Sequence, residues 1–392
     1  MPKFTTPRDI YFGRGCMDAL RSLEGKRAFI VIDGGPVKTS GIIDRAISYL
    51  EEAGFETYLF EGVESDPSVE TVRSGVKVLE AFGPDWIIPI GGGSTMDAAK
   101  AMWVLYEHPD ADIFNINPSS MPRLRGKARF LAIPTTSGTG SEVSNASVIC
   151  DYSTGVKFGV AGFDIIPDIA VLDPDAADTM PKKLTAHTGL DALSHAAEAF
   201  ASKFASPFSD ANALYASKMV FDFLPAAYEG DADAREAMHY AQCLAGIAFT
   251  GSMLGLSHAI AHKTGGMFDA GHIPHGLANS IYLPYAIQYN SKAPGAKAKY
   301  VMMAKFNGIE GADDDGLVSG LAAKARNLAS SLGSPVSLKE YGIPEDEWNE
   351  KRNIIAENAM NDEQLISNPR EISLETMQRV LQYIYEGRDI DF

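Results

Sequence analysis

Histidines and an aspartate recur at helical spacing in the second half of the sequence. Asp191 and His195 lie four positions apart, and His258 and His262 repeat that spacing. Residues four apart share one face of a helix, so each pair can present its side chains to a single site. His275 follows in the segment Gly-His-Ile-Pro-His-Gly. Each pair alone is also compatible with hydrogen-bonded core histidines, but a carboxylate with several imidazoles in apolar surroundings predicts a divalent metal such as Fe²⁺ or Zn²⁺.

Three consecutive glycines stand where a strand pattern gives way to a helix pattern, in the segment Ile-Pro-Ile-Gly-Gly-Gly-Ser. Glycine lets the backbone approach a ligand closely, and a helix start presents N–H groups at the positive end of its dipole. We therefore predict a phosphate site over Gly91, Gly92, Gly93 and Ser94, with Asp97 one turn further on. The alternative is a tight turn in which Ser94 caps the helix and Asp97 completes a capping box.

Two other loops also follow strand patterns. Asp33 ends the apolar run 26–32, where an acid can accept both ribose hydroxyls of a dinucleotide and repel a 2′-phosphate. It is equally compatible with an Asx turn into the two glycines that follow. Residues 134–142 read Pro-Thr-Thr-Ser-Gly-Thr-Gly-Ser-Glu, which suits either a loop that binds a polar ligand or a self-capping Ser/Thr turn. A Gly-x-Gly pattern at Gly13 lacks its third glycine and is rejected as a dinucleotide fingerprint.

The elements that must position these residues divide the chain at about Pro181. Before it, strand-like runs alternate with helical patterns, which predicts a parallel sheet covered by helices on both faces. After it, long Ala-, Leu- and Met-rich stretches have helical spacing and strand signals largely vanish. We therefore predict an α/β domain over residues 1–180 and an all-helical domain over 181–392. The acidic tail from Glu340 is expected to be a solvated helical surface.

Composition bounds the class of protein. The 392 residues are 45% hydrophobic and 22% charged, as in ordinary globular proteins. A net charge of -17 argues against general affinity for nucleic acid or anionic membranes. Three scattered cysteines favour a reducing cytoplasm, and the first residues lack the apolar core of an export signal. Residues 240–262 carry no charge, but their polar groups and glycines predict a helix buried in protein rather than in a bilayer.

Taken together, these segments resemble the iron-containing alcohol dehydrogenase family, and also the alcohol dehydrogenase portion of bifunctional aldehyde-alcohol dehydrogenases. The match follows the same order over essentially the whole chain and is carried by residues 91–100, 134–139, 189–198, 258–262 and 274–276. The resemblance implies the dehydroquinate synthase-like fold: an N-terminal Rossmann-like dinucleotide domain and a C-terminal helical metal domain, with the active site in the cleft between them. It also implies a homodimer or larger homo-oligomer.

The resemblance assigns roles to residues by position. Those that match the family's metal ligands are Asp191, His195, His258 and His275, whereas His262 matches a non-ligand histidine that faces the substrate. Those that match cofactor contacts are Gly92, Gly93, Ser94, Thr135, Thr136, Thr139 and Lys157. Asp33 matches the position where an acid goes with NAD rather than NADP. Fe²⁺ is then the expected metal and Zn²⁺ the alternative, since imidazole and carboxylate suit both.

The implied function is a metal-dependent, NAD(H)-linked alcohol dehydrogenase that interconverts a small primary alcohol and its aldehyde by hydride transfer. Two segments depart from the simplest family pattern: the loop 265–275 adds Asp269 and His272, and residues 144–146 are more polar than in many relatives. A reductase for an anionic aldehyde such as sulfoacetaldehyde or succinic semialdehyde therefore stays open, as does a zinc polyol dehydrogenase of the glycerol type. A non-catalytic nucleotide-binding protein is disfavoured by the intact metal and phosphate motifs.

Overall fold

The computed structural model describes residues 3–153 and 156–392, which form two compact units, Met1–Met180 and Pro181–Phe392. Within the described residues, the first unit contains a parallel sheet of order β1-β8-β5-β4-β2-β3. Its strands are β1 (Asp9–Phe12), β2 (Arg27–Asp33), β3 (Glu56–Val63), β4 (Trp86–Gly91), β5 (Arg129–Pro134) and β8 (Ile169–Leu172). The predicted α/β class of the N-terminal part is confirmed.

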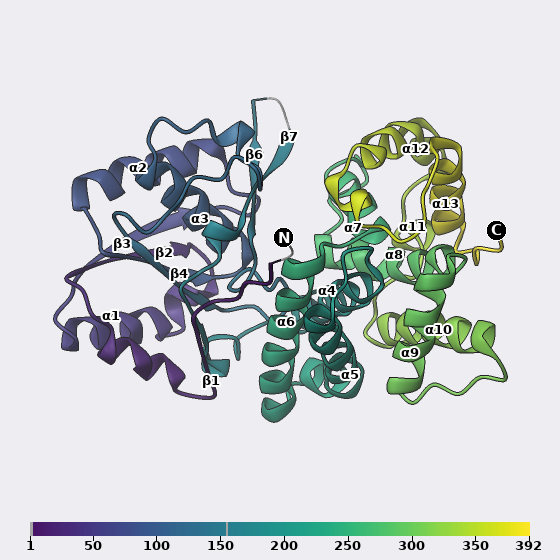
Figure 1. Cartoon of the computed structure of the whole chain (residues 1–392), viewed down its shortest axis with the longest axis horizontal. Coiled ribbons are helices and arrows are strands. Elements are labelled where there is room, and N and C mark those ends of the chain that lie inside the picture. Colours follow the sequence, from purple (N-terminus) through teal and green to yellow (C-terminus); the bar gives the residue numbers. More distant parts are fainter. Residues whose placement is uncertain (1–2, 154–155) are drawn as a thin grey trace. The chain divides into compact units, whose positions relative to one another are not determined.

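Helices cover both faces of this sheet. Successive side chains along a strand point to opposite faces, and in β2 both sets are buried. Phe29 and Val31 of β2 pack into the core of α2 (Val69–Phe82) and α3 (Gly93–Glu107). Ile30 and Ile32 pack into the core of α1 (Ile42–Glu52) on the opposite face. Figure 1 shows α2 and α3 on one side of the strands and α1 on the other. Burial on both faces explains why β2 is an almost continuous apolar run.

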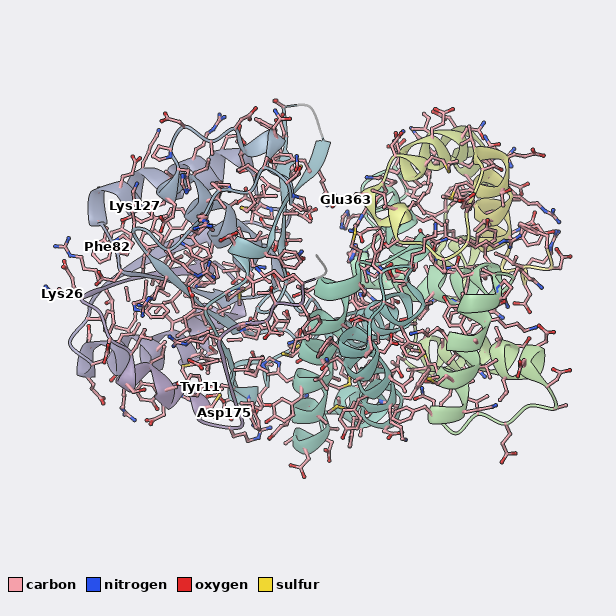
Figure 2. All side chains as sticks on the ribbon, in the orientation of Figure 1. Tyr11, Lys26, Phe82, Lys127, Asp175 and Glu363 are labelled. Carbon is pink, nitrogen blue, oxygen red and sulfur yellow. The ribbon has the colours of Figure 1, made fainter. Side chains whose placement is uncertain are left out.

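Aromatic side chains from α2, β2 and β3 pack together at the β3 end of the sheet. Phe82, labelled in Figure 2, ends α2 and has its ring centroid 5.6 Å from that of Tyr58 in β3 and 6.4 Å from that of Phe29. Phe29 and Tyr58 are stacked, with centroids 5.5 Å apart. The end of α2 is thereby fixed against β2 and β3.

An antiparallel hairpin, β6 (Ala146–Asp151) and β7 (Val156–Ala161), packs on α3. The backbone N–H of Val148 donates to Asp97 Oδ2 at 3.0 Å, and that of Cys150 donates to Pro67 O at 2.9 Å. The hairpin is therefore bonded both to α3 and to the loop that precedes α2.

The second unit is helical in its described residues, which confirms the predicted class. Its helices are α4 (Lys182–Ala201), α5 (Pro207–Glu229), α6 (Ala232–Ser252), α7 (Leu256–Thr264), α8 (His275–Asn290), α9 (Pro294–Phe306), α10 (Asp314–Ser331), α11 (Leu338–Tyr341), α12 (Glu345–Met360) and α13 (Leu374–Glu386). Helices α4, α5, α6, α9 and α10 share one apolar core. Helices α7, α8, α11, α12 and α13 share a second core.

The expectation of a solvated surface beyond Glu340 is wrong in part. The segment is helical, but Trp348, Ile355, Met377 and Leu381 are fully buried in the second core. Helix α13 is strongly amphipathic, so only one of its faces is exposed. The polar residues of the tail lie on that outer face, so the overall composition of the segment does not reveal the buried inner face.

No single described helix is long and apolar enough to cross a membrane. Helices α6 and α7 together have the necessary length and composition, but they are bent by 103° at the break between them. Most of their residues are buried within the second unit.

Candidate functional site

Four side chains converge within the second unit. Asp191 and His195 come from α4, His258 comes from α7, and His275 begins α8. One nitrogen or carboxylate oxygen from each lies within 4.8 Å of the others. Asp191 Oδ1 is 3.7 Å from His258 Nε2 and 3.8 Å from His275 Nε2, and its Oδ2 is 4.0 Å from His195 Nε2. The structure thus brings together the four residues predicted as ligands, and their binding of a metal stays a proposal.

The donor set fits a metal cation. His258 Nε2 is buried and has no hydrogen-bond partner among the described residues. Its other ring nitrogen, Nδ1, lies 2.5 Å from Glu198 Oε2, a contact that fixes the tautomer and leaves Nε2 for a metal. Burial alone would raise the pKa of Asp191, but His195, His275 and His258 hold it well below its usual range. An ionised carboxylate among imidazoles is a suitable cage for a divalent ion.

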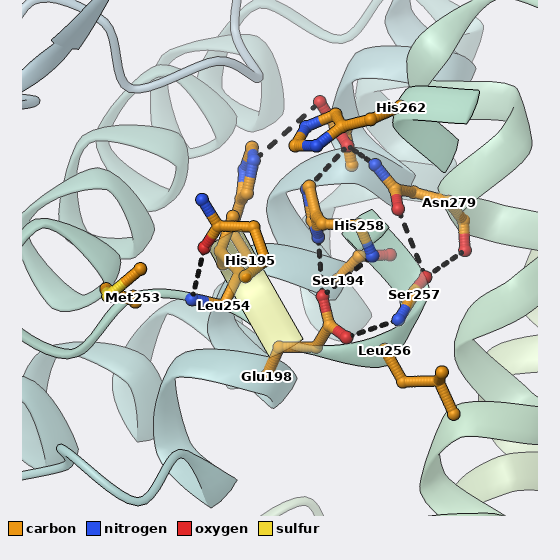
Figure 3. A network of polar contacts seen from close by, with 12 residues as sticks. Ser194, His195, Glu198, Met253, Leu254, Leu256, Ser257, His258, His262 and Asn279 are labelled. Atoms are coloured by element: carbon orange, nitrogen blue, oxygen red, sulfur yellow. Dashed lines mark hydrogen bonds and ion pairs between the residues drawn. The ribbon is translucent and has the colours of Figure 1, made fainter. Parts of the chain in front are cut away.

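A second layer of residues holds the cluster (Figure 3). Glu198 Oε1 accepts a hydrogen bond from the backbone N–H of Ser257 at 2.6 Å. Asn279 is fully buried, and its Nδ2 donates to Asp191 Oδ1 at 2.9 Å and to His275 Nε2 at 3.1 Å. Ser257 Oγ donates to Asn279 Oδ1 at 3.1 Å, which orients the amide. Neither Glu198 nor Asn279 was assigned a role from the sequence, although Asn279 lies one helical turn after His275.

A glycine sets the distance between α8 and α4. A Cβ atom at Gly276 would lie 2.3 Å from the carbonyl oxygen of His187 and 3.2 Å from Asp191 Cβ. Any larger residue would therefore push the first turn of α8 away from α4. The neighbouring His275 would move with it, so this glycine is required for the cluster.

His262 lies beside the cluster, with its ring stacked on that of His275 at 5.4 Å between centroids. Its Nδ1 is 3.0 Å from Asp362 Oδ2, and Lys263 Nζ is 2.9 Å from the same oxygen. Burial alone would raise the pKa of Asp362, but the hydrogen bond and charge of His262 and the charge of Lys263 hold it well below its usual range. An ionised Asp362 fixes the His262 tautomer with the proton on Nδ1 and leaves the other ring nitrogen for proton exchange. No sequence pattern pointed to Asp362.

In the first unit, the turn that Gly91, Gly92 and Gly93 form between β4 and α3 (the glycine turn) packs against the threonine-rich loop that follows β5. Cβ atoms at Gly92 and Gly93 would lie 3.2 Å from Thr136 Cγ2 and 3.0 Å from Thr139 Cγ2, respectively. Thr136 Oγ1 is buried without a hydrogen-bond partner in the described part of the chain. The backbone N–H of Thr135 donates to Gly91 O at 2.9 Å. A close backbone approach with an unsatisfied hydroxyl fits a polar ligand such as a dinucleotide phosphate.

The capping-box alternative is wrong. Helix α3 begins at Gly93 with Gly92 as its N-cap, and no side chain caps it. The carboxylate of Asp97 instead accepts hydrogen bonds from Ser141 Oγ and the Val148 N–H, each at 3.0 Å. Burial raises the pKa of Asp97 to about 6 against the opposing charge of Lys100. Asp97 therefore ties α3 to the neighbouring loop and hairpin, and its contact with a cofactor stays a prediction.

The remaining cofactor candidates lie around the same edge of the sheet. Asp33 ends β2, which pairs with β4, the strand that leads into the glycine turn. Its Oδ1 accepts a hydrogen bond from the Gly35 N–H at 2.9 Å, so the Asx turn is present. Lys157 Nζ is 2.7 Å from Asp66 Oδ2, and the Asp66 N–H donates to Ser94 Oγ at 3.4 Å. The carboxyl ends of parallel strands are where open α/β sheets bind dinucleotides.

Two family models match the chain. Residues 7–174 match the iron-containing alcohol dehydrogenase model. Residues 185–385 match the C-terminal model of the Fe-containing alcohol dehydrogenase family. The two matches cover the glycine turn and the histidine cluster, respectively.

Individual proteins and structures are similar over the whole chain. The NADPH-dependent butanol dehydrogenase of Clostridium saccharobutylicum is 49% identical over 393 residues, which cover 100% of both chains. The bifunctional aldehyde-alcohol dehydrogenase of Escherichia coli K12 is 38% identical over 98% of this chain but only 46% of its own length. The iron-containing alcohol dehydrogenase of Thermococcus thioreducens superimposes with a TM-score of 0.90 at 35% identity, covering 98% of this chain and 100% of that one.

Proposed function

Because the chain belongs to the iron-containing alcohol dehydrogenase family, we propose that it interconverts a small primary alcohol and its aldehyde by hydride transfer to or from a nicotinamide dinucleotide. The observation that carries this proposal is the convergence of Asp191, His195, His258 and His275 within 4.8 Å. Family membership implies a metal and a nicotinamide cofactor. We propose Fe²⁺ as that metal and these four residues as its ligands.

The chain's residues divide the work of the reaction. A divalent metal would supply Lewis acidity toward the substrate oxygen, and the dinucleotide would supply or accept the hydride. Glu198 and Asn279 keep the ligand atoms aimed at one point. His262, with Nδ1 fixed by Asp362 at 3.0 Å, moves a proton to or from the substrate hydroxyl through its other nitrogen. The His262 side chain is 30% exposed, so that proton can reach solvent.

We propose NAD(H) as the preferred dinucleotide, bound by Asp33, Gly92, Gly93, Ser94, Asp97, Thr135, Thr136, Thr139 and Lys157. The carboxylate of Asp33, at the end of β2, supports this preference because it would repel a 2′-phosphate. The Clostridium relative is named for NADPH, so the preference needs a direct measurement. We further propose that the protein is cytoplasmic and forms a homo-oligomer. Size-exclusion chromatography with light scattering would test the oligomeric state.

The test of function uses protein purified without oxygen and loaded with Fe²⁺. Loss of NADH and of NADPH is followed with propanal, butanal, sulfoacetaldehyde and succinic semialdehyde, and NAD⁺ reduction is followed with butanol and glycerol. We expect the fastest turnover with propanal or butanal. Strong preference for the anionic aldehydes, or for glycerol with Zn²⁺, would replace the proposed substrate class. Absence of turnover with every compound and both metals would contradict the proposed activity.

A further inference from the structure

Asp66 is held in an uncommon backbone conformation beside the first turn of α3. Its φ is 57°, in the left-handed region that few residues other than glycine, asparagine and aspartate adopt. Its N–H donates to Ser94 Oγ at 3.4 Å, and its carbonyl accepts a hydrogen bond from Tyr152 Oη at 3.0 Å. These contacts fix Asp66 next to the proposed phosphate site.

The carboxylate of Asp66 forms an ion pair with Lys157, with Oδ2 2.7 Å from Nζ. The two residues belong to different elements, since Lys157 lies in β7 and Asp66 lies between β3 and α2. Cys150 faces Lys157 across the hairpin, and its N–H donates to Pro67 O at 2.9 Å. The packing of the hairpin on this loop therefore builds the ion pair into the fold.

A carboxylate is an unfavourable neighbour for a phosphate. The charge of Asp66 neutralises that of Lys157, one of the residues proposed to hold the dinucleotide. Its field also reaches α3: burial is the main reason that the pKa of Asp97 is raised to about 6, and the charge of Asp66 adds to that rise. The chain thus places an acid where a site optimised only for tight anion binding would have none.

We propose that Asp66 competes with the bound dinucleotide for Lys157 and thereby speeds dinucleotide release. Lys157 is paired with Asp66 in the free protein and exchanges that carboxylate for oxygens of the dinucleotide on binding. This exchange weakens binding, and it favours turnover where product release limits the rate. The inference rests on the proposed role of Lys157 in cofactor binding.

The decisive variant is Asp66→Asn. Asparagine has nearly the same shape, tolerates the left-handed conformation and keeps both backbone hydrogen bonds, but it carries no charge to neutralise Lys157. NADH and NADPH affinities are measured by fluorescence titration, and release rates by stopped flow, in metal-free protein without substrate. We expect Asp66→Asn to bind both dinucleotides about two- to fivefold more tightly, the range for an exposed ion pair. The gain should come from slower release and should shrink as salt is added.

A matched control comes from the Lys218–Asp222 pair on α5. That pair also has a 2.7 Å contact, with side chains 40% and 43% exposed, against 40% and 42% for Lys157 and Asp66. Asp222→Asn removes the same charge and should leave dinucleotide affinity unchanged. Equal tightening by Asp222→Asn would show a general charge effect and overturn the proposal.

Lys157→Gln separates competition from direct repulsion. We expect Lys157→Gln to weaken binding, and Asp66→Asn to have no further effect in that background. Tightening that persists without Lys157 would show that Asp66 repels the dinucleotide directly, and the competition would be overturned. It would also be overturned if Asp66→Asn changed nothing while Lys157→Gln weakened binding. If Lys157→Gln bound normally, the role of Lys157 and this inference would both fail, whereas the proposed dehydrogenase activity is judged separately by turnover.

Discussion

The side-chain amide of Asn279 donates one hydrogen bond to Asp191 at 2.9 Å and, from the same nitrogen, another to His275 at 3.1 Å. The two residues come from different helices, α4 and α8. Asn279 therefore holds a carboxylate and an imidazole at the spacing of the cluster without any contribution from a metal. The hydrogen bond to Asp191 aims that carboxylate at the cluster, as an outer contact of a metal ligand does, whereas the contact with Nε2 of His275 must be given up if that nitrogen binds a metal.

Asn279→Ala should lower metal affinity about 10- to 100-fold, the range for losing an outer-layer partner. The affinity is measured by competition with a chromophoric chelator in the absence of substrate. Asn307→Ala is the control, because Asn307 is also a buried amide whose Nδ2 donates two hydrogen bonds, to Ser217 and Met303. Both variants should lose stability, but only Asn279→Ala should lose metal. Equal metal affinity in the two variants would remove the role given to Asn279.

Local spacing explains why most of the cluster could be predicted from the sequence. Positions four apart on a helix share a face, so Asp191 with His195 could be read as one half of a metal site. The same rule applied to His275 finds Asn279, a signal that the prediction did not use. Asp362 could not be found this way, because it lies 100 residues after His262 and meets it only through the packing of the tail.

The fold could be predicted where the apolar spacing is regular, and the prediction failed where it is not. Helix α2, residues 69–82, has a regular apolar spacing that ends at Gly83, so its bounds can be recognised in the sequence. The hairpin β6–β7 was missed because Ala-Ser-Val-Ile-Cys-Asp shows neither a long apolar run nor strict alternation. Lys157 was therefore assigned only by resemblance, and its partner Asp66 was not assigned at all.

Metal affinity should depend on pH through His258. Burial lowers the pKa of His258, but Asp191 and Glu198 outweigh it and raise the pKa to about 9 from the ordinary 6.5. A metal must displace this proton, so affinity for Zn²⁺, used as a probe, should keep rising above neutral pH and level near that value. The raised pKa of His258 also stabilises the metal-free protein against unfolding. This contribution is fully present below the pKa that His258 has in the unfolded chain, and it is lost as pH rises through the pKa in the folded protein.

Glu198→Gln tests the cause of that shift. Glutamine can still accept a hydrogen bond from His258 Nδ1 but carries no charge. The pKa of His258 should therefore fall, and the Zn²⁺ affinity should reach its plateau at a lower pH than in the wild type. Calorimetry in buffers of different ionisation enthalpy counts the protons released on binding. A wild-type affinity that is already constant at neutral pH would contradict the proposed displacement.

His262→Ala should lower kcat by about 100-fold or more, the range for a lost general acid or base, and leave metal content unchanged. Asp362→Asn should lower kcat less, because it weakens the hold on the His262 tautomer without removing the ring. His108→Ala in the other unit serves as the control for loss of a histidine. Loss of metal in His262→Ala would instead make His262 a ligand and move the proton step elsewhere.

Cofactor preference should depend on the charge of Asp33 rather than on the turn that it forms. Asp33→Asn can still accept the hydrogen bond from the Gly35 N–H but loses the charge, whereas Asp33→Gly loses both. If the carboxylate repels a 2′-phosphate, both variants should shift the ratio of kcat/KM for NADPH over NADH upward by about five- to tenfold, as expected for removing one like charge near the surface. A shift in Asp33→Gly alone would assign the preference to the turn. A wild-type enzyme that already prefers NADPH, or two variants with unchanged ratios, would reject the role proposed for Asp33.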